Sequence, residues 1–419
     1  MSPLFHLLQL TYGEHIANDL SEVLQSWNLE TGKICSITTD GAPNIMAAVR
    51  LLMGEGHYHV PCMAHLLNLC VFRVLERTSS INDVIEKVKQ IVTYFRRSIS
   101  SSDALRAAQR QKGVLVPLEL IQAVQTRWNS TFYSLQRFAE LAGCVSQVLL
   151  SKDHRTAPPM LTSEELAVAN YLVAVLGPFD KATKEISGEK YVTASIVLPM
   201  VNCLRTAVAE GSSVSEGDVV PLTDISAELL QEIDKRLVIL ENNSLLASAT
   251  VLDPRFKLLH FQVPINTGNI LQWLSREMNS EVSSSSTPQR TTAKDVSSRP
   301  SKDVPFWDLH DRMSRRSNTR EMPATSTELH PELKLYLTLP QEERTKCPLK
   351  FWSDRDKTFP TLSRLAFKYL TVMGSSVPSE RVVSRLNAIA SHKRNRLSPA
   401  HIDMLIFMSS IERDVWFGN

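Results

Sequence analysis

The sequence lacks a strong excess of either charge. Its 46 Lys and Arg residues oppose 44 Asp and Glu residues, which leaves a formal net charge of +2 over 419 residues. So small a charge creates no global field that would draw the protein onto nucleic acid or an acidic membrane surface. Any contact with DNA must therefore come from a local cluster of cations.

Cysteine pairs and long apolar runs are also missing. The six cysteines are scattered singly, which excludes a disulfide scaffold and is typical of a reducing compartment: Cys35, Cys62, Cys70, Cys144, Cys203 and Cys347. No run of about 18 apolar residues occurs, and Met1 to Leu10 contain neither a basic region nor a small-residue cleavage site. We expect a soluble protein that is not secreted and has no membrane partner.

The first third of the chain alternates helical patterns with one strand. Apolar residues recur at helical spacing over 15–27, and the short β-branched run KICSITTD ends in Asp40. Amphipathic helices are predicted at 66–74 and 81–95. A strand and helices in alternation favour an α/β layer.

Helical spacing continues through most of the remaining chain. Residues 132 to about 259 predict an all-helical block, whereas about 279–328 is rich in Ser, Thr, Arg and Pro and is expected to be disordered. Further helices are predicted at 359–373 and 379–390. A last helix opens at Leu397-Ser398-Pro399, where Ser398 can cap and Pro399 takes the first helical position.

Two acids are candidates for chemistry. Asp40 stands at the carboxyl end of the predicted strand, the edge where α/β sheets bind ligands and ions. The alternative is that it only caps the next helix. Glu380 lies in the first turn of its helix, where the helix dipole already favours a negative charge without any catalytic role.

Two further motifs could contact metal or DNA. The candidates for zinc ligands are His57, His59, Cys62, His65 and Cys70. The CxxH spacing of Cys62 and His65 suits two ligands on a turn entering a helix, but no second pair completes a tetrahedral set, and a core role for Cys70 is favoured. Arg127 beside Trp128 places a cation next to a flat ring, which suits a base-stacking platform. A Trp near a helix start is more often part of the core.

Together these stretches resemble the hAT transposase superfamily, and within it the zinc finger BED proteins derived from such transposases. The matching segments are ITTDGAPNIMAAV, CMAHLLNLCV, QTRWNSTFYSLQR, ATVLDPRFK and FPTLSRLAFKYLTVMGSSVPSERVVSRLNAIASHKRNRLSPAHIDMLIFM. The similarity covers nearly the whole chain except the polar segment, and the last stretch is its most specific part.

The resemblance implies an RNase H-like fold in which three carboxylates hold two divalent ions, with a large helical domain inserted before the last acid. Asp40 matches the second acid, Glu380 the third, and residues 132 to about 330 the insertion. Magnesium prefers oxygen ligands, and two ions clamp the attacking and leaving oxygens of an in-line displacement.

The resemblance also assigns DNA contacts. Cys62 and His65 match the family's CxxH motif, and Trp128 with Arg127 matches its platform for a flipped base.

The sequence departs from the family pattern at its N-terminal end. The family's first acid lies on a strand upstream of the second, and no matching strand precedes Asp40. The earlier acids fall on the wrong elements: Glu14, Asp19, Glu22 and Glu30. The BED finger is missing as well. We therefore expect an N-terminally truncated chain that does not cleave phosphodiesters.

The C-terminal block is a dimerisation region in this family, formed largely by residues 348–408. Apolar residues recur there at helical spacing, as a partner surface would require, although they could pack only within the monomer: Leu362, Leu365, Ala366, Tyr369 and Leu370. A nearby basic cluster could face phosphate or form a solvated helix face: Arg381, Arg385, Lys393, Arg394 and Arg396.

The predicted fold is α/β plus all-α: a partial RNase H-like core at 1–131, a helical insertion at 132–345 and the hAT dimerisation region with the returning core helix at 346–419. We expect an inactive, transposon-derived nuclear protein that forms a homodimer or higher homo-oligomer and associates with DNA in transcriptional regulation, without metal or cofactor. The alternative is an active, Mg²⁺-dependent transposase or nuclease with a DDE-type carboxylate site.

Overall fold

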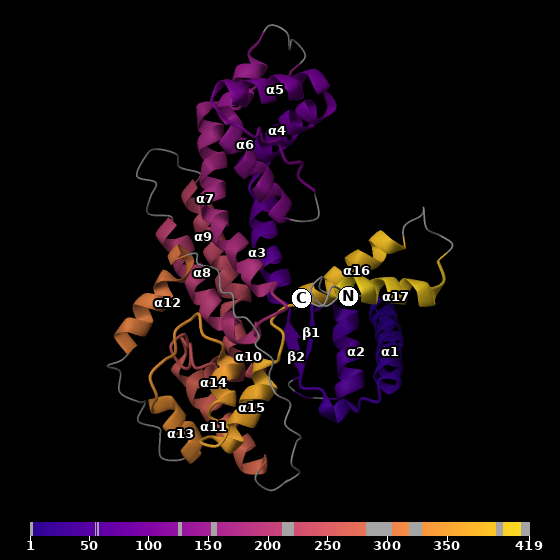
Figure 1. The fold of residues 1–419 in the computed structure, drawn as a ribbon, viewed down its shortest axis with the longest axis vertical. Coiled ribbons are helices and arrows are strands. Elements are labelled where there is room, and N and C mark those ends of the chain that lie inside the picture. Colours follow the sequence, from indigo (N-terminus) through magenta and orange to yellow (C-terminus); the bar gives the residue numbers. More distant parts are fainter. Residues whose placement is uncertain are drawn as a thin grey trace.

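The computed structural model describes residues 3–54, 56, 58–124, 128–151, 157–211, 222–281, 304–317, 329–390 and 397–411. Helices dominate, and they form a long arm above a body, with a small sheet and further helices to one side (Figure 1). No helix within these ranges is both long and apolar enough to cross a membrane.

The small sheet lies between the helical arm and an N-terminal helix pair. Strand β1 (Ile37–Thr39) pairs in parallel with β2 (His59–Pro61), and α2 (Pro43–Met53) connects them after the short turn η1 (Thr31–Lys33). Helix α1 (Pro3–Ser26) packs on α2. The predicted strand and the helix before it are confirmed. The larger RNase H-like sheet is not confirmed, because the described residues form a sheet of two strands.

The arm consists of helices that bury one apolar stripe each. The helices predicted at 66–74 and 81–95 are confirmed as α3 and α4, and the predicted all-helical block follows. The bounds are α3 (Met63–Arg77), α4 (Ser79–Arg97), α5 (Ile99–Gln111), α6 (Trp128–Leu149), α7 (Ser163–Ile186), η2 (Ala194–Ile196), α8 (Val197–Gly211) and α9 (Leu222–Arg236). Thr162 and Glu165 start α7 with a reciprocal capping box, which satisfies two of its free N–H groups.

The body is built around one buried helix. From Leu245 to Leu252, every residue of α10 is buried. Helix α10 spans Ser244–Leu252, and the elements around it are η4 (Val238–Asn242), α11 (Pro264–Glu281), α13 (Pro331–Thr338), α14 (Pro348–Ser353) and α15 (Pro360–Leu370). The carbonyls that end α10 accept hydrogen bonds from Tyr336 Oη (3.0 Å, to Val251) and Trp352 Nε1 (2.7 Å, to Leu252). Side chains from the C-terminal segments therefore complete this helix end.

The ATVLDPRFK motif forms a buried ionic turn at the end of α10. The Asp253 carboxylate accepts hydrogen bonds from Arg255 Nε (2.9 Å) and Nη2 (2.7 Å) and from Ser195 Oγ (2.7 Å). Lys257, at φ +47°, donates from Nζ to the carbonyl of Tyr336 at 3.0 Å. Burial lowers the pKa of Lys257 to about 8. The motif thus joins the helical block to the C-terminal segments.

The predicted disorder of residues 279–328 is wrong in part. Residues 279–281 belong to α11, and α12 (Val304–Ser317) is a helix packed on α8. Its Trp307 is 1% exposed and donates from Nε1 to Glu185 Oε1 at 2.8 Å. Buried aromatic contacts offset the entropy of ordering this helix. The rest of the segment lies outside the described residues.

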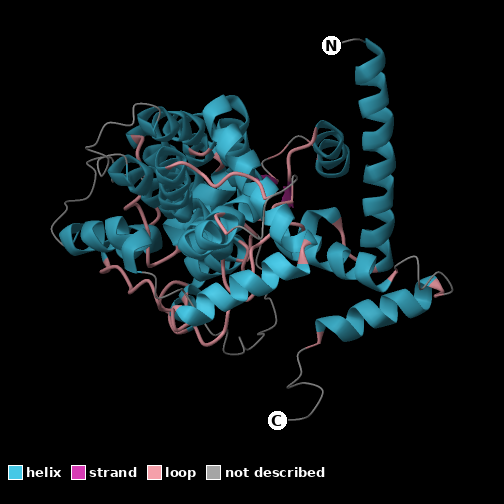
Figure 2. Cartoon of the chain, turned by 90° about the horizontal axis from the view of Figure 1, so that it is seen from above, coloured by secondary structure: helices cyan, strands magenta, loops and turns pink. Residues whose placement is uncertain are grey.

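Helices α16 (Val377–Ile389) and α17 (Pro399–Ser410) pack on each other and project from the junction of arm and body. Figure 2 shows that the helix next to each chain terminus lies at the periphery, outside the main bundle. Within their described side chains, neither α16 nor α17 buries a residue. The predicted cap of the last helix is confirmed, since Ser398 Oγ accepts the His401 N–H.

Candidate nucleic-acid site at the strand edge

The link between α15 and α16 runs along the edge of the sheet. Thr38 Oγ1 donates to the carbonyl of Met373 (2.8 Å), and the Gly374 N–H donates to Thr193 Oγ1 (2.9 Å). A side chain on Gly374 would approach Ile186 Cδ1 at 2.8 Å and the Thr193 carbonyl at 3.0 Å. Only glycine fits where the chain passes so close to Ile186 and Thr193. This close packing holds the start of α16 beside β1.

Cys62 connects the strand to α16. The residue is 1% exposed, its N–H donates to the Thr39 carbonyl (2.7 Å), and its Sγ accepts the Ser376 N–H (3.3 Å). His65 is half-buried one turn into α3. In the described part of the chain, no three His, Cys, Asp or Glu side chains are grouped so that they could hold a metal ion. The geometry gives Cys62 a positioning role.

Asp40 and Glu380 flank this connection, and each is exposed. Asp40 Oδ1 accepts the Ala42 N–H at 3.0 Å, so it closes the turn before α2 without capping the helix itself. Glu380 Oε1 accepts a hydrogen bond from Ser376 Oγ at 3.0 Å, and it lies in the first turn of its helix as predicted. These two acids alone do not fit a two-ion clamp, which expects a further carboxylate.

His59 belongs to the same edge, and the sequence suggested it only as a zinc ligand. Its Nε2 shares a hydrogen bond with Thr39 Oγ1 at 2.8 Å. Burial lowers the pKa of His59, and the charge of Asp40 acts in the opposite direction. The pairing of β1 with β2 brings this imidazole to Thr39, and three residues ending in proline gave no strand pattern that could have predicted this position.

The structure corrects the expected base-stacking platform. Trp128 is 2% exposed, and its ring packs against Phe132 (6.2 Å between centroids) and edge-on against Phe179 (6.3 Å). A nucleic-acid base could reach this ring only if the Trp128 side chain left the core. The structure therefore favours the interpretation of Trp128 as a core residue. Arg127 lies outside the described residues.

The basic cluster is described only in part. Arg381 has 43% of its side chain exposed and forms an ion pair with Glu189 at 3.6 Å, and Arg385 is partly exposed. An exposed pair of this kind is weak, so Arg381 remains available to phosphate. Lys393, Arg394 and Arg396 lie outside the described residues.

The residues expected to form the dimer face are buried within the monomer. Each is at most 2% exposed: Leu362, Leu365, Ala366, Tyr369 and Leu370. Their helix, α15, packs on α10, α11 and α14. Their apolar stripe therefore belongs to the core of the chain, which corrects the expectation of a partner surface.

Exposed apolar side chains lie instead on the next two helices. Val382 and Val383 of α16 are 43% and 54% exposed. On α17, Met404, Phe407 and Met408 are 60%, 66% and 40% exposed. Apolar side chains gathered on one exposed helix pair are typical of an interaction surface.

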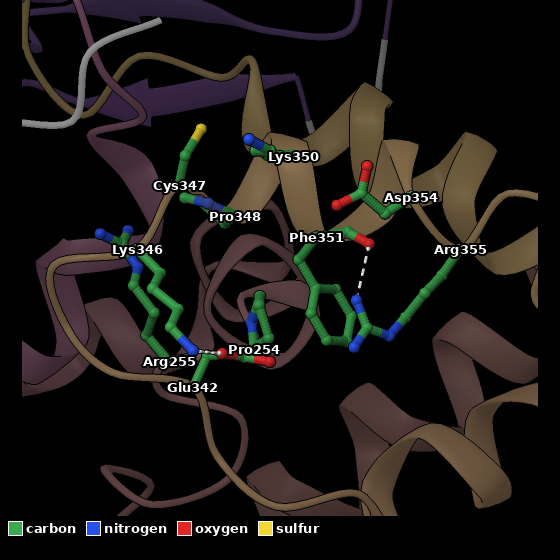
Figure 3. Close-up of a pocket in the computed structure, with 10 residues that line it drawn as sticks. All are labelled: Pro254, Arg255, Glu342, Lys346, Cys347, Pro348, Lys350, Phe351, Asp354 and Arg355. Carbon is green, nitrogen blue, oxygen red and sulfur yellow. Dashed lines mark hydrogen bonds and ion pairs between the residues drawn. The ribbon is translucent and has the colours of Figure 1, made fainter. Parts of the chain in front are cut away.

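A pocket of about 400 Å³ separates the ATVLDPRFK turn from α14 (Figure 3). Lys346 pairs with Glu342 at 2.8 Å, and the Arg355 guanidinium lies 4.0 Å from the Phe351 ring centre. Arg255 and Lys346 of this pocket are paired within the chain, with Asp253 and Glu342 respectively.

Comparison with known families identifies the C-terminal segments. The model of the hAT family C-terminal dimerisation region matches residues 332–410, and the ZBED1 RNase-like helical domain matches residues 60–175. The chain is a relative of the hAT transposases. The first match covers α13–α17, and the second covers the arm from β2 into α7.

Individual relatives agree at low identity. Zinc finger BED domain-containing protein 4 of Homo sapiens is 25% identical over 94% of this chain and 32% of its own length. The putative transcriptional regulator tpeD of Talaromyces stipitatus is 25% identical over 96% and 49%. The putative AC transposase of Zea mays is 23% identical over 96% and 51%. This hAT relative thus spans about a third to a half of their lengths.

Proposed function

We propose that this hAT relative is a transposon-derived, DNA-associated homodimer that acts in the nucleus in transcriptional regulation, and that residues 1–419 do not cleave DNA. The observation that carries the proposal is the matched dimerisation region, whose α16–α17 pair exposes its apolar side chains. A relative named as a putative transposase supports the transposon origin, and a relative named as a putative transcriptional regulator supports the regulatory role.

The partner surface is the α16–α17 pair. Val383, Met404 and Phe407 are each more than half exposed, which leaves apolar area in water that a second copy can cover. Arg381 and Arg385 project from the same helix pair, so a dimer brings two basic sites together. Each phosphate contact releases counterions and strengthens binding without regard to sequence.

The absence of cleavage is proposed from the number of ligands, because Asp40 and Glu380 supply two carboxylates and a two-ion clamp expects a third. Asp40 is held by the turn before α2, and Glu380 by the Ser376 hydroxyl. One observation favours the alternative of an active nuclease: the Cys62–Ser376 hydrogen bond brings the start of α16 to the strand edge. Incubation with a labelled duplex and Mg²⁺ tests this point. Nicking that Asp40→Asn and Glu380→Gln both abolish would establish the nuclease.

Light scattering at micromolar concentration tests the dimer. Phe407→Ser is expected to give a folded monomer, because it removes exposed apolar area without touching the core. Leu115→Ser is the matched control, since Leu115 is 95% exposed on the arm, away from α16 and α17, and should leave the dimer intact. A monomeric parent protein would contradict the proposal.

Salt-dependent anisotropy of a labelled duplex tests the DNA contact. Arg381→Gln and Arg385→Gln should each lower the slope of log affinity against log salt by about 1, as expected for the loss of one phosphate contact. Arg312→Gln is the control, because Arg312 pairs with Glu210 on the arm. Unchanged slopes in both α16 variants would refute a DNA contact through this helix.

A further inference from the structure

A second pocket lies at the end of the strands opposite to Asp40. Cys35 precedes β1 and Tyr58 precedes the parallel strand β2, and both line this pocket together with residues of α11 and α15. Its volume is about 520 Å³. Small-molecule clefts typically enclose about 300–1,000 Å³, so a compact ligand fits.

One wall of the pocket is aromatic. Trp273 is 40% exposed, whereas Trp128, Trp307 and Trp352 are buried. Trp273 Nε1 donates to Tyr369 Oη at 3.5 Å, and Tyr369 Oη in turn donates to Glu277. This chain of contacts braces the exposed indole. With the half-buried Tyr58, the pocket has flat rings on which a planar ligand can stack.

Cations lie beside this wall. Lys368 pairs with Glu277 at 2.5 Å while 43% of its side chain stays exposed, and Lys33 is exposed on η1. Ser244 also lines the pocket. Two lysines and one glutamate leave a positive charge next to the rings, and lysine binds phosphate as a point charge. Aromatic rings beside cations are the combination that holds stacked bases and their backbone.

We propose that this pocket binds a nucleoside monophosphate unit, with the base against Trp273 and Tyr58 and the phosphate at Lys33 and Lys368. The unit is a free nucleotide or one residue of a single strand, which share this chemistry. The inference goes beyond the proposed function, because duplex contact through α16 needs no such pocket.

Calorimetric titration of the full chain tests the site. The ligands are adenosine monophosphate, adenosine, and single-stranded oligodeoxyadenylate of about ten nucleotides. Adenosine monophosphate should bind saturably and more tightly than adenosine. Trp273→Ala should weaken the binding of adenosine monophosphate by about 5- to 150-fold, the usual effect of losing one stacking ring. Trp27→Ala is the control and should leave this binding unchanged, because Trp27 is 74% exposed and lies outside the pocket. Lys33→Met should weaken the nucleotide and spare adenosine.

Alkylation of the unmodified protein provides a readout that no variant can confound. Cys35 lines this pocket and Cys347 lines the other, and both are partly exposed. Adenosine monophosphate should slow the alkylation of Cys35 and leave Cys347 unchanged. Equal protection of both, or none, would overturn the proposal.

The source of the ligand follows from the titrations. Binding of the mononucleotide alone supports a free nucleotide, and binding of the oligonucleotide at the same residues supports a single strand. No saturable binding of either, or unchanged affinity in Trp273→Ala, refutes the site. If the chain binds the nucleotide but proves to be monomeric or does not bind the duplex, the proposed function is refuted and the nucleotide site stands.

Discussion

Helix α12 should detach when its tryptophan is removed. Trp307 is 1% exposed and lies parallel to Phe256 with 6.1 Å between ring centres, and the Arg344 guanidinium stands 5.3 Å from its ring. Truncation of a buried Trp to Ala costs about 3–5 kcal/mol. Because α12 contacts chiefly α8, we expect this loss to release α12 while the rest of the arm stays folded.

Hydrogen exchange measures this release locally. In Trp307→Ala, the amides of α12 and of the α8 face beneath it should exchange faster, while those of α10 keep their protection. Trp307→Phe keeps an aromatic ring but loses part of the indole area and the N–H group that donates to Glu185, and loss of that hydrogen bond should cost about 1–3 kcal/mol. Trp27→Ala, at an exposed site, is the control. Unchanged α12 protection in Trp307→Ala would refute the reasoning.

Three further changes test other parts of the structure. Burial lowers the pKa of His260 to about 3 and of His310 to about 4, so below about pH 6.5 these histidines bind protons in the unfolded chain but not in the folded chain. The free energy of unfolding should therefore fall as the pH drops from about 6.5 toward 4. In urea unfolding, His310→Gln should make this fall less steep. Cys62→Ala leaves the Ser376 N–H without its acceptor and should speed exchange of that amide, at a cost of about 1–3 kcal/mol, whereas Cys70→Ala should not affect it. Leu365→Ala should lower the free energy of unfolding in urea by about 2–5 kcal/mol and leave the oligomeric state in light scattering unchanged. If the variant stays folded but dissociates, α15 would be the partner surface after all.

The positions of most helices could be predicted because their signal is local. Apolar spacing located α3, α4 and α15, and Ser398 with Pro399 located the start of α17. Asp40 at the end of a strand could be predicted in the same way. Helix α12 could not, because its few apolar residues stand in a Ser- and Arg-rich stretch and depend on anchors such as Glu185, 122 residues away.

The surroundings of the site could not be predicted from the sequence. An apolar stripe such as that of α15 has the same spacing whether it packs on its own chain or on a second copy. The Cys62–Ser376 contact joins residues 314 positions apart, and no local pattern specifies such a pair. For Trp128 the sequence left a core role and a stacking platform both open, and its burial depends in part on Phe179 of another helix.

The way α10 ends has a consequence for synthesis on the ribosome. Tyr336 and Trp352 reach the carbonyls of this helix from 85 and 100 residues later in the chain. At about 5–20 residues per second, these side chains emerge roughly 5–20 s after their acceptors. During that interval, α10, which is buried from Leu245 to Leu252 in the folded chain, lacks the segments that cover it. We therefore expect nascent chains stalled before Tyr336 to engage chaperones more strongly than chains released after Leu370.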